Sequence, residues 1–306
     1  MPVKDKELVR EIERLKKERE ALILSHYYQL SEVQDIADFI GDSLELSRRA
    51  ASTSAKVLVF CGVHFMAETA AILSPEKIVL IPDLSAGCPL AAAVTPEELR
   101  ARKEQMPEAA VVCYVNTTAA VKAESDIVCT SANAAKVVQS LPPGKKVLFV
   151  PDGNLGRYAA RQNPDRQFVF WDGYCHVHNQ IGAKDIVKAK QEHPEAKVVA
   201  HPECRPEVLD LVDKAASTSG MLRFARESAA REFIIVTEEG LLHQLSKENP
   251  EKRFHLASPG LVCPEMKKIN LEKIHRSLET LEPRVEVPAS IRMRAVKAVE
   301  RMLAVN

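Results

Sequence analysis

Short apolar runs alternate with amphipathic stretches along almost the whole chain. The runs are rich in Val, Ile, Leu and Phe, and Gly, Pro or Asp closes many of them, a pattern typical of buried strands. They are LILSHYY (22–28), KVLVFCG (56–62), KIVLIPD (77–83), VVCYVN (111–116), IVCTS (127–131), KVLFVPDG (146–153), QFVFWDG (167–173), KVVAHPE (197–203), FIIVTEEG (233–240) and RFHLASPG (253–260). The intervening stretches, such as SEVQDIADFI (31–40), have the pattern of helices. This alternation predicts an α/β fold with short parallel sheets.

The same order of runs and helical stretches occurs three times, and matching features recur at nearly constant intervals. These are Cys88, Cys175 and Cys263 at intervals of 87 and 88 residues, Ser43, Ser131 and Thr218 at 88 and 87, and Gly62, Gly153 and Gly240 at 91 and 87. We therefore predict three similar αβα-layered domains related by a pseudo-threefold axis, although generic α/β alternation produces some such matches by chance. The predicted domains are residues 1–95 with the N-terminal helix, 96–182 and 183–265, followed by a helical cap over 266–306.

The two ends of the chain have helical spacing of a different kind. Residues 1–20 form a charged helix with Leu8, Ile12 and Leu15 on one stripe. After residue 266, two helical stretches are separated by EPRVEVP, and the second has Ile291, Ala295, Val299 and Met302 at helical spacing. We expect these stretches to pack as a cap, with the opening helix against them.

Composition narrows the class of protein. The chain has 306 residues, with 42 basic and 42 acidic side chains. It therefore lacks the positive net charge that would favour binding to nucleic acid, and we expect it to act on small molecules. No apolar stretch is long enough to cross a membrane, and the first residues lack the apolar core of a secretion signal. With seven cysteines, an odd number, we expect reduced thiols in the cytoplasm, where metal binding is a better prediction than disulfides.

A single central site follows from the repeat, because ligands of parallel sheets bind beyond the carboxyl ends of the strands. The loops after the fourth strands supply Cys88, Cys175 and Cys263. Those after the second strands supply Ser43, Ser131 and Thr218, which either cap the following helices or help to bind an anion there. The first strands add His26 with Tyr28, Tyr114 with Asn116, and His201 with Glu203.

The three cysteines do not each have a histidine nearby at the spacing of metal ligands. Three such thiolates favour an iron–sulfur cluster over zinc. Three protein thiolates on a four-iron cluster leave one iron open to act as a Lewis acid, which suits removal of water from a carboxylate-bearing substrate. Zinc on Cys175 and His178 is the alternative, because these residues lie at ligand spacing. Otherwise His178 is expected to contact substrate.

Nine segments in order resemble the quinolinate synthase family over essentially the whole chain. They are SHYYQ, GDSLEL, GVHFMAET, CYVNTTA, TSANA, PDGNLG, HPEC, ASTSGM and EVP. The resemblance implies an enzyme of NAD biosynthesis that condenses iminoaspartate with dihydroxyacetone phosphate to give quinolinate, phosphate and two waters. It also implies a [4Fe-4S] cluster, and a functional link to an aspartate oxidase or dehydrogenase that supplies the imine.

The resemblance also implies roles for individual residues. The cluster ligands would be Cys88, Cys175 and Cys263, and the substrate-binding residues His26, Ser43, Tyr114, Asn116, Ser131, His178, His201, Glu203 and Thr218. Glu203, Tyr28 and His201 would be catalytic, and we expect burial to tune the pKa of Glu203 towards neutrality for acid–base work. Some members have a CxxCxxC group at the third cysteine, whereas this chain has CPEM. A disulfide switch is therefore not expected there.

Two other classes of protein stay open at this point. One is a zinc hydrolase that uses Cys175 and His178. The other is a non-catalytic protein that senses iron or binds a ligand but leaves triose phosphate unchanged.

Overall fold

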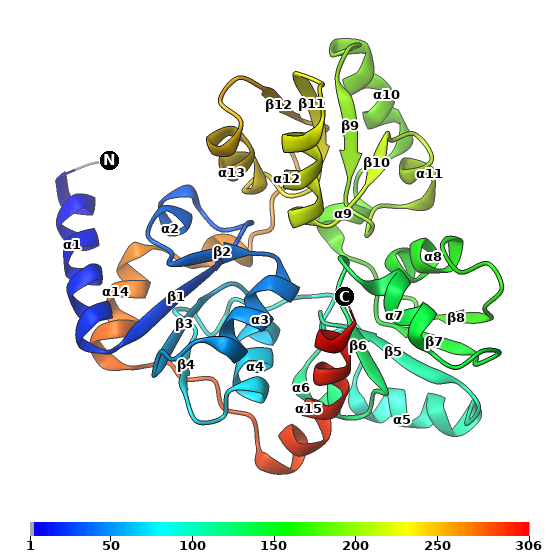
Figure 1. The fold of residues 1–306 in the computed structure, drawn as a ribbon, viewed down its shortest axis with the longest axis horizontal. Coiled ribbons are helices and arrows are strands. Elements are labelled where there is room, and N and C mark those ends of the chain that lie inside the picture. The colour runs from blue at the N-terminus through cyan, green and yellow to red at the C-terminus, as the bar shows by residue number, and fades with distance from the viewer. Residues whose placement is uncertain (1–2, 306) are drawn as a thin grey trace.

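Three four-stranded parallel sheets form the frame of the computed structural model, which describes residues 3–305. The strand orders are β2-β1-β3-β4, β6-β5-β7-β8 and β10-β9-β11-β12, so each sheet has the same order relative to its own first strand. Figure 1 shows the three lobes arranged around a common centre. The predicted α/β class with three similar domains is confirmed.

The first sheet and its helices occupy the N-terminal third of the chain. They are α1 (Val3–Glu18), β1 (Ala21–His26), α2 (Ser31–Asp35), β2 (Phe39–Gly41), α3 (Ser43–Ser52), β3 (Val57–Cys61), α4 (His64–Leu73) and β4 (Ile78–Leu80). The second set is α5 (Pro96–Gln105), β5 (Ala110–Tyr114), α6 (Ala119–Ala123), β6 (Ile127–Cys129), α7 (Ala134–Ser140), β7 (Val147–Val150), α8 (Gly153–Arg161), β8 (Phe168–Phe170) and α9 (His176–Asn179).

The third set repeats the arrangement, and helices close the chain. The elements are α10 (Ala183–Glu192), β9 (Lys197–Ala200), α11 (Pro206–Leu209), β10 (Lys214–Ala215), α12 (Thr218–Glu227), β11 (Glu232–Val236), α13 (Leu241–Glu248) and β12 (Arg253–Leu256). A 3₁₀ turn η1 (Met266–Lys268), α14 (Leu271–Thr280) and α15 (Ala289–Ala304) follow. The boundaries between the domains stay predictions.

The prediction of one helix over residues 31–40 is wrong. The helix ends at Asp35, and Phe39–Gly41 pairs with β1 as β2. Asp38 sets this pairing, because its carboxylate accepts the N–H of Ile23 at 2.8 Å while its own N–H donates to the carbonyl of Ile23 at 3.0 Å. Sheet pairing thus overrides the helical spacing of the apolar residues.

The same aspartate clamp occurs in all three domains. Asp126 accepts the N–H of Val111 and Asp213 that of Val198, each at 2.8 Å, as Asp38 does with Ile23. In each case the aspartate precedes the second strand of its sheet, and it fixes the position of that strand beside the first one. This recurrence supports triplication independently of the cysteine spacing.

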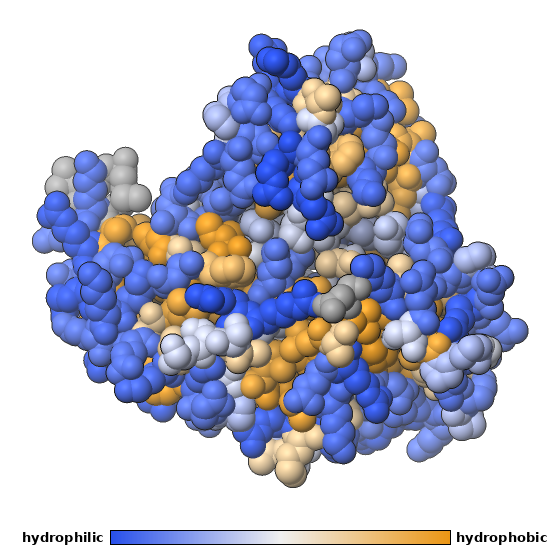
Figure 2. Space-filling view, viewed as in Figure 1, coloured by the Kyte–Doolittle hydropathy of each residue, from blue (hydrophilic) through white to orange (hydrophobic). Residues whose placement is uncertain are grey.

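The C-terminal helices pack along the first and second domains. Helix α15 contacts α4, α6 and β6, and it buries Ala295, Val299 and Met302. Helix α14 packs against α1, which buries Ile12 and Leu15, so the opening helix pairs with the C-terminal region as predicted; residues 1 and 2 lie outside the described part. In Figure 2, hydrophilic residues cover most of this face, and hydrophobic ones gather around α15.

None of the described helices combines the length and apolar character that crossing a membrane requires.

Candidate functional site

A cavity opens where the carboxyl ends of the three sheets meet. Its lining includes every residue that the sequence predicts for the site: His26, Tyr28, Ser43, Cys88, Tyr114, Asn116, Ser131, Cys175, His178, His201, Glu203, Thr218 and Cys263. The structure therefore brings all of these residues together, while their individual roles stay predictions. The arrangement follows from the strand direction, because loops after parallel strands gather at one edge of each sheet.

The hydroxyl groups of Ser43 and Thr218 do not cap the helices that follow them, although the sequence allowed that role. Helix α3 is capped by Asp42, whose carboxylate accepts the N–H groups of Leu44 and Glu45. Ser217 caps α12, so Ser43 and Thr218 are the first residues inside their helices. In the second domain, Ser131 lies 3.1 Å from Nε2 of His201 across the domain boundary. Two helix N-termini thus offer hydroxyl groups to the cavity, an arrangement suited to an anion.

Each cysteine of the cavity begins a helical turn. The carbonyl groups of Cys88, Cys175 and Cys263 accept the N–H groups of the residues four positions later, at 3.2, 2.8 and 3.3 Å. Nearby backbone N–H groups lower the pKa of each thiol against the effect of burial: those of Ala91 and Leu90 at Cys88, that of His178 at Cys175, and those of Met266 and Glu265 at Cys263. By contrast, burial alone sets the pKa of Cys61. N–H groups aimed at sulfur are a feature of iron–sulfur ligation.

The three thiols are also close enough to affect one another. Burial raises the pKa of Cys88 to about 12, with smaller contributions from the charges of Glu203 and Cys263. Burial likewise raises the pKa of Cys175 well above its usual range, with a smaller contribution from Cys88. These thiols are therefore protonated unless a cation binds them, because a coordinating thiol loses its proton.

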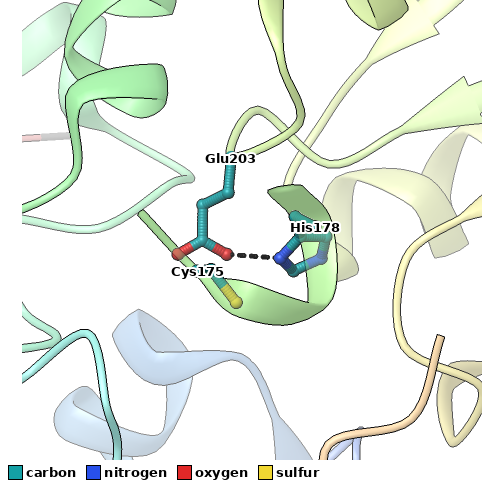
Figure 3. A group of neighbouring side chains, drawn as sticks. All are labelled: Cys175, His178 and Glu203. Atoms are coloured by element: carbon teal, nitrogen blue, oxygen red, sulfur yellow. Dashed lines mark ion pairs between the residues drawn. The ribbon is translucent and has the colours of Figure 1, made fainter. Parts of the chain in front are cut away.

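The carboxylate of Glu203 lies beside two imidazole rings that are stacked on each other, those of His178 and His201, of which Figure 3 shows His178. Its Oε2 is 2.9 Å from Nδ1 of His178 and 3.1 Å from Nδ1 of His201. The approach to His178 is an ion-pair contact rather than a directed hydrogen bond, and this Nδ1 atom has no hydrogen-bond partner. The other carboxylate oxygen, Oε1, is buried and also has none.

The expectation that the pKa of Glu203 is near neutrality is wrong. Burial raises this pKa, but His178 and His201 outweigh burial and lower it below the ordinary value. Glu203 is therefore ionised near neutral pH. An ionised carboxylate is suited to accept a proton rather than to donate one.

Thr237 connects His178, and through it Glu203, with Tyr28 of the first domain. The sequence did not point to this residue. Its hydroxyl oxygen lies 2.5 Å from the phenol oxygen of Tyr28 and 2.8 Å from Nε2 of His178. The side chain is fully buried. A continuous polar chain therefore runs from Tyr28 through Thr237 and His178 to Glu203. The available signal was a polar residue directly after the buried strand β11.

Glu238 and Glu265 hold the loop of the third cysteine, and both were missed as well. Glu238 accepts the N–H of Cys263 at 3.1 Å and pairs with Lys267 at 2.9 Å. Glu265 accepts the N–H of Gly87 at 2.9 Å and so connects this loop with the loop that precedes Cys88. Two cysteine loops from distant parts of the chain are thereby fixed relative to each other.

The carboxylates of Asp42 and Glu238 also line the cavity, and its other polar side chains include uncharged phenol, imidazole and amide groups. Burial raises the pKa of Tyr28 and that of Tyr114 well above the usual range, so both phenols keep their protons. Burial lowers the pKa of His26 to about 3. The buried Oδ1 of Asn116 has no protein partner. Buried polar atoms without partners are rare, and here they indicate a polar ligand.

One cysteine of the cavity belongs to a group of three side chains that could hold a single metal ion. Atoms of Cys175, His178 and Glu203 all lie within 4.8 Å of one another (Figure 3). Such a set matches zinc donors. It would use one of the three cysteines of the cavity and leave Cys88 and Cys263 without a ligand.

Comparison with known proteins identifies relatives over the whole length. The sequence profile of a family described as quinolinate synthetase A protein matches residues 10–304. The quinolinate synthase of Desulforudis audaxviator is 60% identical over 298 residues, which are 97% of this chain and 98% of the relative. That of Methanosarcina barkeri is 55% identical over 300 residues, or 98% of both chains. That of Geobacter metallireducens is 55% identical over 295 residues, or 96% of both.

The lowered pKa of His26 predicts how stability depends on pH. Between the ordinary pKa of 6.5 and about 3, the unfolded chain binds a proton at His26 that the folded protein does not. The free energy of unfolding therefore falls as the pH is lowered through this window, by up to about 1.4 kcal/mol per unit for this group. We expect His26→Gln to reduce the pH dependence of the unfolding midpoint between pH 4.5 and 6.5. The same substitution at His275, on α14, serves as the control; equal slopes for wild type and His26→Gln would contradict this account.

Proposed function

Because the chain belongs to the quinolinate synthetase A family and is an enzyme of NAD biosynthesis, we propose that it makes quinolinate from iminoaspartate and dihydroxyacetone phosphate, releasing phosphate and two waters. We further propose that it works in the cytoplasm, supplied with the imine by an aspartate oxidase or dehydrogenase. The observation that carries the proposal is one cavity lined by three thiols and by uncharged donors from all three domains.

The charges of the two substrates fit the cavity. Iminoaspartate brings two carboxylates and the triose brings a phosphate, so binding requires donors more than acceptors. Ser43 and Thr218 at helix N-termini, together with the phenols of Tyr28 and Tyr114, offer such donors without a change of protonation near neutral pH. Asp42 does not oppose anions strongly, because its carboxylate already accepts two N–H groups and the hydroxyl of Ser219.

A [4Fe-4S] cluster on Cys88, Cys175 and Cys263 fits the donors of the cavity. The thiols come from three loops that share one helical-turn geometry, and backbone N–H groups lower the pKa of each thiol. When bound, a cluster with three protein ligands supplies a Lewis-acidic iron for a substrate oxygen.

The protein's own residues handle the protons. Glu203 is ionised, and its Oε1 has no protein partner, so it can accept a proton from bound substrate. The imidazoles of His178 and His201 stabilise the charge of this carboxylate. Thr237 orients the phenol of Tyr28 and the ring of His178, and this connects the two ends of the polar chain.

A zinc hydrolase is the second candidate, because Cys175, His178 and Glu203 could hold one ion. Two observations make it weaker. Nε2 of His178 already contacts Thr237, and its Nδ1 faces Glu203. Zinc on this set also gives no role to the matching turns at Cys88 and Cys263. A protein that binds iron or dicarboxylates without catalysis is the third class, and an assay for quinolinate excludes it.

The cluster proposal predicts which cysteines determine the iron content. Alanine at Cys88, Cys175 or Cys263 should remove most of the iron and the brown colour of anaerobically prepared protein. Cys61→Ala is the matched control, because this thiol is fully buried in β3 and should leave iron content unchanged. The measurements are iron, zinc and sulfide content with the visible absorption spectrum. Full iron content in the three variants, or zinc in place of iron in the wild type, would count against the cluster.

The role of Glu203 is tested by Glu203→Gln, which keeps the size of the side chain and removes its charge. We expect the iron content to stay at the wild-type level and quinolinate formation to fall by about 100-fold or more, in the range typical of general acid–base groups. Glu207→Gln, at an exposed position on α11, should leave both quantities unchanged. Wild-type turnover by Glu203→Gln would remove the proposed role.

The connecting role of Thr237 is tested by two variants, one that removes the hydroxyl group of the side chain and one that keeps it. Thr237→Val removes the hydroxyl, and we expect quinolinate formation to fall by about 5- to 150-fold, equivalent to about 1–3 kcal/mol. Thr237→Ser keeps the hydroxyl and should retain most of the activity, and both variants should keep their iron. The pH profile of the rate should shift only in the valine variant. Equal rates for valine and wild type would mean that Thr237 only fills space.

A further inference from the structure

A second group of metal-binding side chains lies in the third domain, apart from the cavity. His193 is the C-cap residue that follows α10, Glu232 begins β11, and His255 lies in β12. Helix α10 ends and β11 begins at the amino end of the sheet, whereas the cavity lies at the carboxyl end. In Figure 1 this is the outer end of the third lobe, where the arrow of β9 begins. None of these three residues lines the cavity.

The donor atoms of this group converge on one point. Nδ1 of His193 is 3.1 Å from Oε1 of Glu232, and Nε2 of His255 is 2.8 Å from the same oxygen. All three donor atoms lie within 4.8 Å of one another. Ligands about 2.0–2.2 Å from a tetrahedral ion are about 3.4 Å apart. Because the imidazole lone pair lies in the plane of its ring and the two rings are stacked here, one ring has to turn out of the stack to bind the same ion.

Three separate segments hold these donors in place. The N–H of His193 donates to the carbonyl of Ala189 at 2.9 Å, which fixes the end of α10. Strands β11 and β12 are paired, with Ile234 beside His255 and Glu232 two residues earlier on the same face. The two imidazole rings are stacked, with centroids 3.6 Å apart and an angle of 16° between the planes. The backbone therefore brings the three side chains close together without help from a ligand.

We propose that His193, Glu232 and His255 bind a divalent transition-metal ion such as Zn²⁺. Two imidazoles and one carboxylate are common ligands of zinc. The side chains are 26–30% exposed, so the ion can reach them and water can complete its coordination. The bound ion replaces the protons that otherwise lie between the imidazoles and the carboxylate. It ties α10 to β11 and β12, so its role is structural, and it does not depend on the function proposed above.

A histidine paired with a single aspartate elsewhere in the protein provides a matched control. Nε2 of His243 is 2.9 Å from Oδ1 of Asp35, and these side chains are 27% and 38% exposed. This pair has one imidazole, and the third group on its carboxylate is the ammonium of Lys247 rather than a ligand. The contact between His243 and Asp35 is therefore an ordinary histidine–carboxylate contact, which lacks the second imidazole of the proposed site.

The experiment measures Zn²⁺ binding to anaerobic, iron-loaded protein by equilibrium dialysis against ZnCl₂ with elemental analysis. Wild type and His243→Ala should bind one Zn²⁺ that His255→Ala and Glu232→Gln do not. We expect the affinity to fall more than the roughly 10- to 100-fold that follows loss of a group hydrogen-bonded to a metal ligand. Zn²⁺ should also raise the unfolding midpoint of wild type and His243→Ala, but not that of the other two variants.

A crystal of the wild-type protein soaked in ZnCl₂ gives a test that does not depend on how the variants fold. Anomalous scattering at the zinc edge should show a peak between His193, Glu232 and His255. Absence of a peak there would overturn the proposal, even if zinc occupies the central cavity. The proposal would also be wrong if His255→Ala and Glu232→Gln bound as much Zn²⁺ as the wild type with equal affinity.

Discussion

Parallel strands have their carboxyl ends at one edge of a sheet, and in this chain three such edges face one cavity. No single domain therefore holds a complete site. His201 meets Ser131 across one boundary, and Tyr28 meets Thr237 across another. Asp42 accepts the hydroxyl of Ser219 across the same boundary as the second contact. The distances that matter for chemistry are thus distances between domains, and packing between domains determines them.

Within that frame, the electrostatics of the cavity depend on one carboxylate. Burial of a charge is costly unless a partner compensates for it, and Glu203 has two imidazoles at about hydrogen-bond distance. The partners reverse the effect of burial on its pKa. The surrounding phenols, in contrast, have no compensating cation and stay protonated. Glu203 therefore supplies a negative charge beside phenols that keep their protons, and Asp42 and Glu238 add two further carboxylates to the lining.

The sequence was sufficient to predict the class of fold, the triplication and the residues that line the cavity. These depend on strand order and on spacing along the chain, both of which are visible in a list of residues. The features that could not be predicted depend on contacts between distant segments. Sheet pairing turned residues 39–41 into a strand, Asp42 and Ser217 took over the capping, and His178 lowered the pKa of Glu203. Thr237 had a visible place after a strand, but its two partners come from other elements.

The pairing of α1 with α14 has a consequence for the order in which the chain folds during synthesis. The apolar stripe of α1, with Ile12 and Leu15, is buried with the help of residues 271–280. The ribosome makes that segment about 260 residues after α1, when the other two sheets have already been translated. The N-terminal domain therefore cannot complete its packing first, and the apolar stripe of α1 stays partly uncovered on the nascent chain until translation is almost finished.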